Sequence, residues 1–265
     1  MKLSNKWIIL IIIICLFFIV IPSIVSQYKN SENFDLYRQK SNYDDYLIVS
    51  AKYKKSTDFL NEFPAPIKSV VIEKNKDVPN KAGEATSYLY YIIKNYDDLP
   101  ENVIFIHDEN ESWHHNGKIT SEIYYWINEY EQFGKTYHEV NLGILDIKKC
   151  PQHRSYHEYH APNSVYKKFW DEVMLPYIGN YEDAKPEVGR CCAQFIVSKK
   201  NIQQHPKEFY EKYYNWLIEN TKGEGIGDGE FGDPYNGWWT GRYAEYTWRF
   251  IFTTQESKPQ ALQID

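Results

Sequence analysis

Acidic and histidine side chains follow one short apolar run, Val103 to Ile106, and side chains of these types bind hard cations or move protons. His107, Asp108 and Glu109 come directly after the run. In α/β folds, ligands collect at the carboxyl ends of strands, because the strands hold the loops there rigidly. The sequence therefore predicts a site here, with Asp108 and Glu109 as metal ligands. The alternative is a solvated acidic turn after the strand. Because adjacent residues of an extended chain point to opposite faces, both acids can bind one ion only if the loop curls.

Two helix positions add candidates for binding and catalysis. Gly83 and Glu84 start a predicted amphipathic helix, where free backbone N–H groups could bind a phosphate or a sugar hydroxyl. Glu84 is equally explained as compensation of the helix dipole. Glu245 lies one turn before Arg249 on a predicted final helix, as a candidate base or acceptor-sugar contact. Its alternative role is an i,i+4 ion pair with Arg249.

Other histidines and one sequon allow further interpretations. His153, His157 and His160 could serve a zinc hydrolase, although the His-Glu-x-x-His order is missing. Asn110 begins the sequon Asn110-Glu111-Ser112, which predicts N-glycosylation inside the acidic loop. A glycan there conflicts with a catalytic role for the neighbouring acids.

Strands and helices alternate along the chain. Strands are expected over 46–51, 70–72, 103–106 and 193–197, and helices over 83–96, 121–130, 163–174, 207–219 and 242–252. Pro206 is expected at the first position of the fourth helix. This alternation predicts an α/β fold with a mostly parallel central sheet flanked by helices.

An apolar run over residues 7–25 predicts one transmembrane helix, because it is long enough to cross a hydrocarbon core of about 30 Å. Lys2 and Lys6 precede it, which places the N-terminus in the cytoplasm and the rest of the chain on the lumenal or extracellular side. The expected organisation is a tail (1–6), a signal anchor (7–25), a stem (26–44), an α/β domain (45–253) and a polar tail (254–265). A cleaved signal peptide is the alternative, but Ile24-Val25-Ser26 matches a cleavage site poorly.

Composition excludes one class of partner and leaves the thiols open. A formal charge of -6 over 265 residues argues against nucleic-acid binding, which requires clustered Lys and Arg. Cys15 lies in the apolar run, so Cys150 could form a disulfide with Cys191 or Cys192 in an oxidising lumen. The 24 Tyr and 8 Trp suit either stacking against sugars or an aromatic core.

Several motifs occur together in the folded part of the chain. They are Leu47–Tyr53 (LIVSAKY), Asn80-x-x-Gly83-Glu84 with Tyr88–Ile93 and Asn95-Tyr96-Asp97, Ala193–Ser198 (AQFIVS), Pro206-x-x-Phe209-Tyr210 with Trp216-Leu217, and Glu245-x-x-Trp248-x-x-Ile251-Phe252. Over roughly residues 46–253 this combination resembles a family of uncharacterised proteins, best known from fungi and defined as a domain of unknown function. The layout is similar, more distantly, to nucleotide-sugar glycosyltransferases with a single Rossmann-like domain of the A type.

The distant resemblance implies a fold, a reaction and a site. It implies a glycosyltransferase A-like domain on a single-pass Golgi or ER protein that transfers a sugar from a nucleotide-sugar donor to a glycan acceptor. The implied residues are Asn80, Gly83, Glu84 and His107 for the donor, Asp108 and Glu109 for Mn²⁺ or Mg²⁺, and Glu245 with Asp108 for catalysis. His107-Asp108-Glu109 departs from the usual Asp-x-Asp motif. The alternatives are a non-catalytic, membrane-tethered carbohydrate-binding or scaffold protein on the same fold, and a metal-dependent hydrolase.

Overall fold

Five strands form one sheet in the order β2-β1-β3-β5-β4. The strands are β1 (Tyr46–Lys52), β2 (Lys68–Glu73), β3 (Asn102–His107), β4 (Tyr137–Glu139) and β5 (Phe195–Ser198). The computed structural model describes residues 42–63, 67–112, 115, 117–140, 165–180, 193–224, 233 and 235–253, without the side chain of Tyr246. All of these belong to the second of two compact units, Asn42–Asp265.

The sheet is mixed, which corrects the prediction of a mostly parallel one. β1 pairs in parallel with β2 and β3, as expected, but β5 is antiparallel to both β3 and β4. Phe195 at the start of β5 lies opposite Phe105 near the end of β3, so the chain re-enters the sheet at the edge where β3 leaves it. β4 was not predicted, because Tyr137-His138-Glu139 is short and lacks apolar alternation.

The helices agree with the predicted order, with corrections at their ends. They are α3 (Ala85–Asn95), α4 (Ile119–Gln132), α6 (Val165–Phe169), α7 (Leu175–Ile178), α8 (Lys199–Ile202), α9 (Lys207–Asn220) and α10 (Gly237–Phe252), with a π-helical turn at Trp170–Met174 and 3-10 turns at Tyr43–Asp45, Asp58–Glu62 and Tyr96–Asp98. α10 starts five residues before the predicted Arg242, because the Asn236 side chain accepts a hydrogen bond from the Trp239 N–H (2.9 Å) and caps the helix. Pro206 is the N-cap of α9 rather than its first helical residue.

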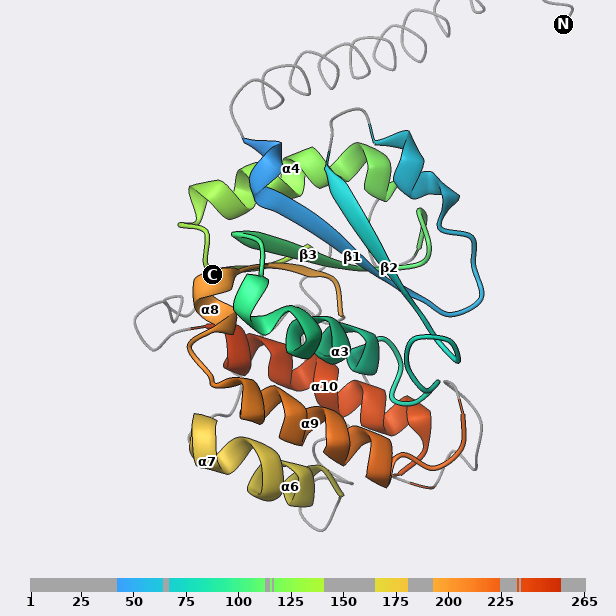
Figure 1. The fold of residues 1–265 in the computed structure, drawn as a ribbon, viewed down its shortest axis with the longest axis vertical. Helices are drawn as coiled ribbons and strands as arrows, with labels where there is room; N and C mark the ends of the chain where they lie inside the picture. Colours follow the sequence, from blue (N-terminus) through green and yellow to red (C-terminus); the bar gives the residue numbers. More distant parts are fainter. Residues whose placement is uncertain are drawn as a thin grey trace, which may run out of the picture. The chain divides into compact units, whose positions relative to one another are not determined.

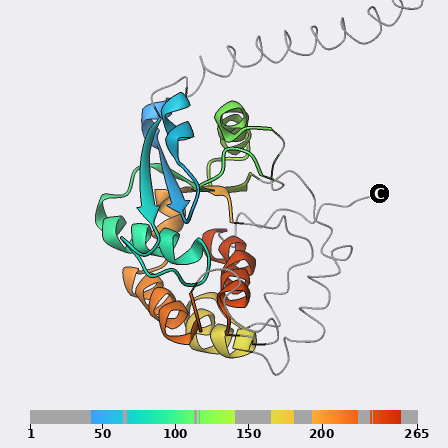
Figure 2. The same cartoon turned by 90° about the vertical axis from the view of Figure 1, so that its right-hand side faces the viewer.

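Helices cover both faces of the sheet. Figure 1 shows α4 over one face and α3, α10 and α9 stacked below the other, and Figure 2 shows the same layers from the side. Strand alternation explains the layers: Val49, Phe105 and Phe195 belong to the core that includes α3, α9 and α10. Tyr46 instead contacts Tyr130 of α4, with ring centroids 6.3 Å apart.

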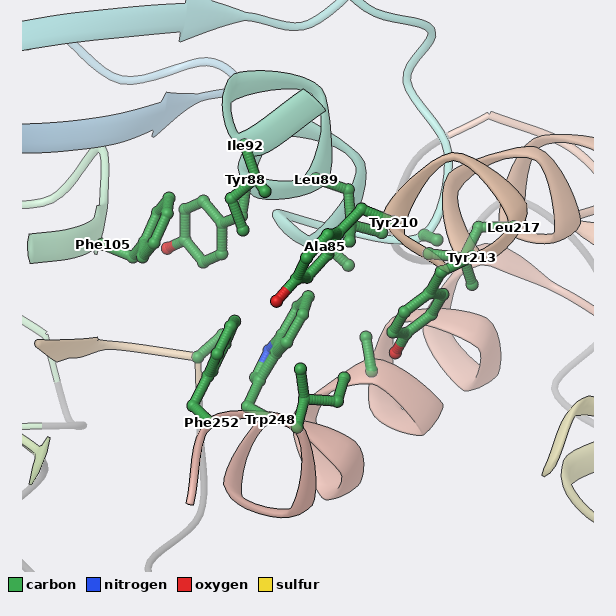
Figure 3. Close-up of a cluster of buried hydrophobic side chains, with 14 of the residues drawn as sticks. Ala85, Tyr88, Leu89, Ile92, Phe105, Tyr210, Tyr213, Leu217, Trp248 and Phe252 are labelled. Atoms are coloured by element: carbon green, nitrogen blue, oxygen red, sulfur yellow. The ribbon is translucent and has the colours of Figure 1, made fainter. Parts of the chain in front are cut away.

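Aromatic side chains dominate the core between the sheet and α3, α9 and α10. Tyr88 lies against Phe105 (4.7 Å between centroids) and Phe195 (5.9 Å), and Trp248 stacks on Phe252 (5.8 Å) (Figure 3). Offset and edge contacts of this kind contribute about 0.5–1.5 kcal/mol each beyond area burial. The prediction of an aromatic core is therefore confirmed for the Tyr and Trp side chains that are buried here.

The carboxyl end of α10 is tied to the segment between β5 and α9. The Ile251 carbonyl accepts from Gln204 Nε2 and lies 3.0 Å from His205 Nε2, and the Phe252 carbonyl accepts from Asn201 Nδ2. These contacts satisfy carbonyls that the helix itself leaves unpaired. The last turn of α10 is thus fixed.

Several predictions fall outside the described residues. They concern the apolar run 7–25, almost all of the stem, the three cysteines beyond it, the His153–His160 cluster and the tail 254–265. Within the described part of the chain, no helix combines the length and apolarity needed to span a bilayer. The signal anchor therefore stays a prediction.

Candidate active site

A cavity of about 300 Å³ opens at the carboxyl ends of β1, β2 and β3 and is closed on the far side by the first half of α10. It is lined by Ala51, Tyr53, Lys74, Asn80, Gly83, Glu84, His107, Asp108, Glu109, Gly237, Trp238, Gly241, Arg242 and Glu245. Every residue predicted for donor binding, metal binding or catalysis is in this set. Of the predicted site residues, only the glycosylation candidate Asn110 lies outside it.

Asp108 is hydrogen-bonded to the backbone of the segment that follows β1. Its Oδ2 accepts hydrogen bonds from the N–H groups of Tyr53 (2.7 Å), Lys54 (3.0 Å) and Lys55 (2.9 Å). Three donors on one carboxylate oxygen leave that oxygen no capacity for a cation. The side chain is buried and joins the end of β3 to the segment that follows β1.

The donor set does not fit a metal cage made by the protein alone. Among the described residues, no group of three or more His, Cys, Asp or Glu side chains is placed to hold a metal ion. Glu109 lies 3.8 Å from Lys55 and its side chain is 39% exposed, so it can offer one carboxylate. The Mn²⁺ or Mg²⁺ ion stays a prediction.

The turn before α3 adopts a conformation that shapes the cavity wall. Ala82 (φ 50°) and Gly83 (φ 55°) are both in the left-handed region, where a non-glycine residue is strained. Gly241 of α10 packs directly on this turn: a Cβ at that position would lie 3.3 Å from the Ala82 carbonyl carbon and 3.4 Å from Gly83 N. The missing side chain lets α10 approach the turn.

Gly241→Ala is therefore expected to push α10 and the 82–83 turn apart by a few tenths of an ångström. We expect a loss of about 1 kcal/mol in the free energy of unfolding, because overpacking outweighs the helix propensity gained. We also expect a larger proportional loss of affinity for any cavity ligand. Denaturant unfolding and calorimetry would measure the two effects. Unchanged affinity would contradict the proposed role of this contact.

Glu245 and Arg242 form an ion pair inside the cavity. Arg242 Nη1 lies 2.8 Å from Glu245 Oε2, and the two side chains are 17% and 15% exposed. The ion-pair partner is Arg242, which lies three residues before Glu245 and lines the cavity, and not the predicted Arg249. Burial raises the pKa of Glu245 to about 7, against the opposing effect of the Arg242 charge, and the nearby Glu84 adds to the rise.

This raised pKa makes stability depend on pH through Glu245. The folded protein favours the neutral form of Glu245. The stability that this form contributes is fully present below the ordinary pKa of 4.5 and is lost as pH rises through about 7. Glutamine at this position does not titrate, so Glu245→Gln does not lose stability in this way as pH rises. We expect the free energy of unfolding of the variant, relative to that of the wild type, to increase by up to ~3 kcal/mol between pH 4.5 and pH 7. Denaturant unfolding at several pH values measures this difference. Glu111→Gln, an acid whose side chain is 67% exposed, is the control. A difference that is constant with pH would contradict the prediction.

Lys74 is a buried amine on the opposite wall. The residue is 8% exposed, and its Nζ donates to the Lys81 carbonyl (3.3 Å) and to Thr86 Oγ1. Burial lowers its pKa to about 7, while the charge of Glu84 opposes the shift. Lys74 was not predicted from the sequence, although it directly follows β2 just as Asp108 directly follows β3.

Tyr53, Trp238 and Arg242 also were not predicted for the site. Trp238 lies in the first turn of α10, before the predicted start of that helix at Arg242, and the Arg242 guanidinium lies 4.9 Å from the Trp238 ring centroid. The signal that could have found this wall is Asn236-Gly237, a side-chain cap followed by a helix start.

Asn110 and His115 lie outside the cavity lining and contact neighbouring parts of the fold, and glycosylation of Asn110 stays a prediction. Asn110 Oδ1 accepts from the Thr120 N–H (3.1 Å) and its Nδ2 donates to Thr120 Oγ1 (3.4 Å), so this amide supports the start of α4. His115 is buried against Trp126 (5.7 Å between centroids), outside the cavity lining. Burial lowers the pKa of His115.

Comparison with known proteins gives a family and no activity. The model of the family described as "Protein of unknown function (DUF3431)" matches residues 47–263. No curated protein and no solved structure matches the chain.

Proposed function

The chain belongs to the family described as Protein of unknown function (DUF3431), which assigns it no activity, and we propose one from the cavity. The proposed activity is the transfer of a sugar from a nucleotide-sugar donor to a hydroxyl acceptor. The observation that carries the proposal is Glu245, a carboxylate with a pKa of about 7 held by Arg242 in a cavity at the strand ends. A general base works best when its pKa lies near the operating pH.

The chemistry requires a base that removes a proton from the acceptor. As the acceptor oxygen attacks the anomeric carbon, the bond to the leaving diphosphate breaks and the acceptor proton passes to Glu245. Arg242, held at 2.8 Å, keeps the carboxylate oriented. Glu84, on the same cavity, is suited to accept hydrogen bonds from sugar hydroxyls.

Ring faces and backbone donors complete the proposed binding site. Tyr53 and Trp238 line the cavity and can pack against the apolar face of a sugar. Gly83 lies two residues before α3, where the dipole of the helix favours a phosphate oxygen. The cavity of about 300 Å³ is at the small end of ligand pockets, which suits a sugar with its phosphates more than a whole nucleotide sugar.

The test is a panel of UDP- and GDP-sugars with the full chain in detergent, with and without Mn²⁺. One donor is expected to raise the melting temperature by several degrees and to release its nucleoside diphosphate when an acceptor is added. Glu84→Gln is expected to lose the shift, and Glu111→Gln, outside the cavity, to keep it. No shift and no release with any donor would overturn the proposal. A shift that requires Mn²⁺ would support the cation.

The engagement of Asp108 favours a second candidate, a non-catalytic carbohydrate-binding protein on the same fold. Oδ2 of Asp108 accepts three backbone N–H groups, so this oxygen stabilises the loop and does not contact a ligand. The same panel separates the two functions. Stabilisation by free sugars, without release of a nucleoside diphosphate from any donor, is the result expected for the binding protein.

A further inference from the structure

Lys74 lines the cavity, and the proposed transfer reaction makes no use of its amine. Its amine is held by two acceptors, the Lys81 carbonyl and Thr86 Oγ1, and Thr86 Oγ1 itself donates to the same carbonyl (2.8 Å). Lys81 belongs to the segment that leads into α3, and Thr86 is the second residue of α3. The backbone of Lys74 is equally fixed, because its N–H donates to the Lys52 carbonyl (2.9 Å).

The acceptors of the Lys74 amine are uncharged, whereas Lys52, at the end of β1, has a carboxylate partner. Lys52 pairs with Glu73 at 3.2 Å, and its side chain is 29% exposed. Among the described carboxylates, none lies within ion-pair distance of Lys74 Nζ, and Glu84 acts on it only at longer range. A buried lysine without a paired carboxylate favours its neutral form, which is the nucleophile.

We propose that Lys74 is a carbonyl-capturing residue, whose amine forms an imine with a small aldehyde or ketone that enters the cavity. A neutral amine that donates two N–H groups to fixed acceptors keeps one tetrahedral direction for its lone pair. Lys81 and Thr86 take up both N–H groups, so the lone pair is not used by either of them, and Lys74 lines the cavity.

The step balances without an oxidant or a reductant. The Nζ lone pair attacks the carbonyl carbon, the π electrons move to oxygen, and one N–H proton passes to that oxygen to give a carbinolamine. The hydroxyl then takes a second proton and leaves as water while the C=N bond forms. Glu84, the carboxylate whose charge acts on Lys74, can carry these protons. The inference does not depend on sugar transfer.

The test uses glyoxylate with cyanoborohydride on the full chain near pH 7, followed by proteolysis and mass mapping of the modified lysines. A pKa of about 7 leaves Lys74 about half neutral, against less than about 0.1% for an ordinary lysine. We therefore expect Lys74 to be labelled at least ~10-fold faster than Lys52, even with restricted access.

Lys74→Arg and Lys74→Met are the matched variants. Arginine keeps a donor and a charge but does not form this imine, so both variants are expected to lose the fast adduct and keep the slow labelling of surface lysines. Wild-type protein that labels Lys52 and other surface lysines while Lys74 stays unmodified would overturn the proposal. Because labelling is mapped on the wild type, poor folding of a variant does not obscure the result.

Discussion

Glu245→Gln is expected to lower the rate of sugar transfer by about 10²- to 10⁴-fold, the range that general-base catalysis contributes. The amide side chain of this variant would keep a hydrogen-bond acceptor for Arg242 but could not take the acceptor proton. Affinity for the donor should change little, because the base acts on the acceptor in the transition state. The loss should therefore appear in kcat and not in the donor KM.

The measurement is the initial rate of nucleoside diphosphate release with the donor found by thermal stabilisation. The melting temperature of the variant, recorded beside it, shows that the fold is intact. Glu111→Gln serves as the control, since that acid lies outside the cavity and pairs with Lys118 at 3.7 Å on the surface. A rate within about threefold of the wild type would show that Glu245 is not the base.

Asp108→Ala is expected to cost about 2–4 kcal/mol of folding free energy, the largest effect on stability predicted for a single cavity residue. The substitution removes the shared acceptor of three backbone N–H groups at 2.7–3.0 Å. Hydrogen bonds to a charged partner contribute roughly 1.5–3 kcal/mol each, and part of this returns when the loop turns its N–H groups to water. A fall in melting temperature of about 5–15 °C follows for a domain of this size.

Glu109→Ala is the matched control for Asp108→Ala. Glu109 is the next residue, also an acid of the cavity, but its contact with Lys55 is 3.8 Å long and largely exposed. Exposed pairs of this kind contribute at most about 1 kcal/mol. Equal losses for the two variants, measured by denaturant unfolding, would contradict the distinct role given to Asp108.

The alternation of apolar runs predicted most of the fold. β1, β2, β3 and β5 follow from their apolar segments, and α3, α4 and α9 from helical spacing. The direction of β5 could not be predicted, because a buried strand has the same apolar sequence pattern whether it pairs with its neighbours in parallel or antiparallel. β4 and the first turns of α10 were missed where the local pattern is polar or starts at an unrecognised cap.

The candidate site was predicted in position but not in the role of its central acid. The rule that polar residues after strands share one edge brought attention to His107, Asp108 and Glu109, and all three line one cavity. Sequence alone gives no signal that Asp108 would accept three N–H groups from residues more than fifty positions away. Nor does it show that Glu245 would pair with Arg242, since Arg242 and Arg249 both lie one helical turn from it.

The anchoring of the last turn of α10 has a consequence for how this family can diversify. One end of that helix is held by side chains from the segment after β5, while the other end carries Trp238, Arg242 and Glu245. Changes at Asn201 or His205 can alter heat tolerance while the ligand-facing turns keep their identity. Mutations around Trp238 can change what is recognised without loosening the anchor. Selection can therefore adjust durability and specificity on separate stretches of one helix.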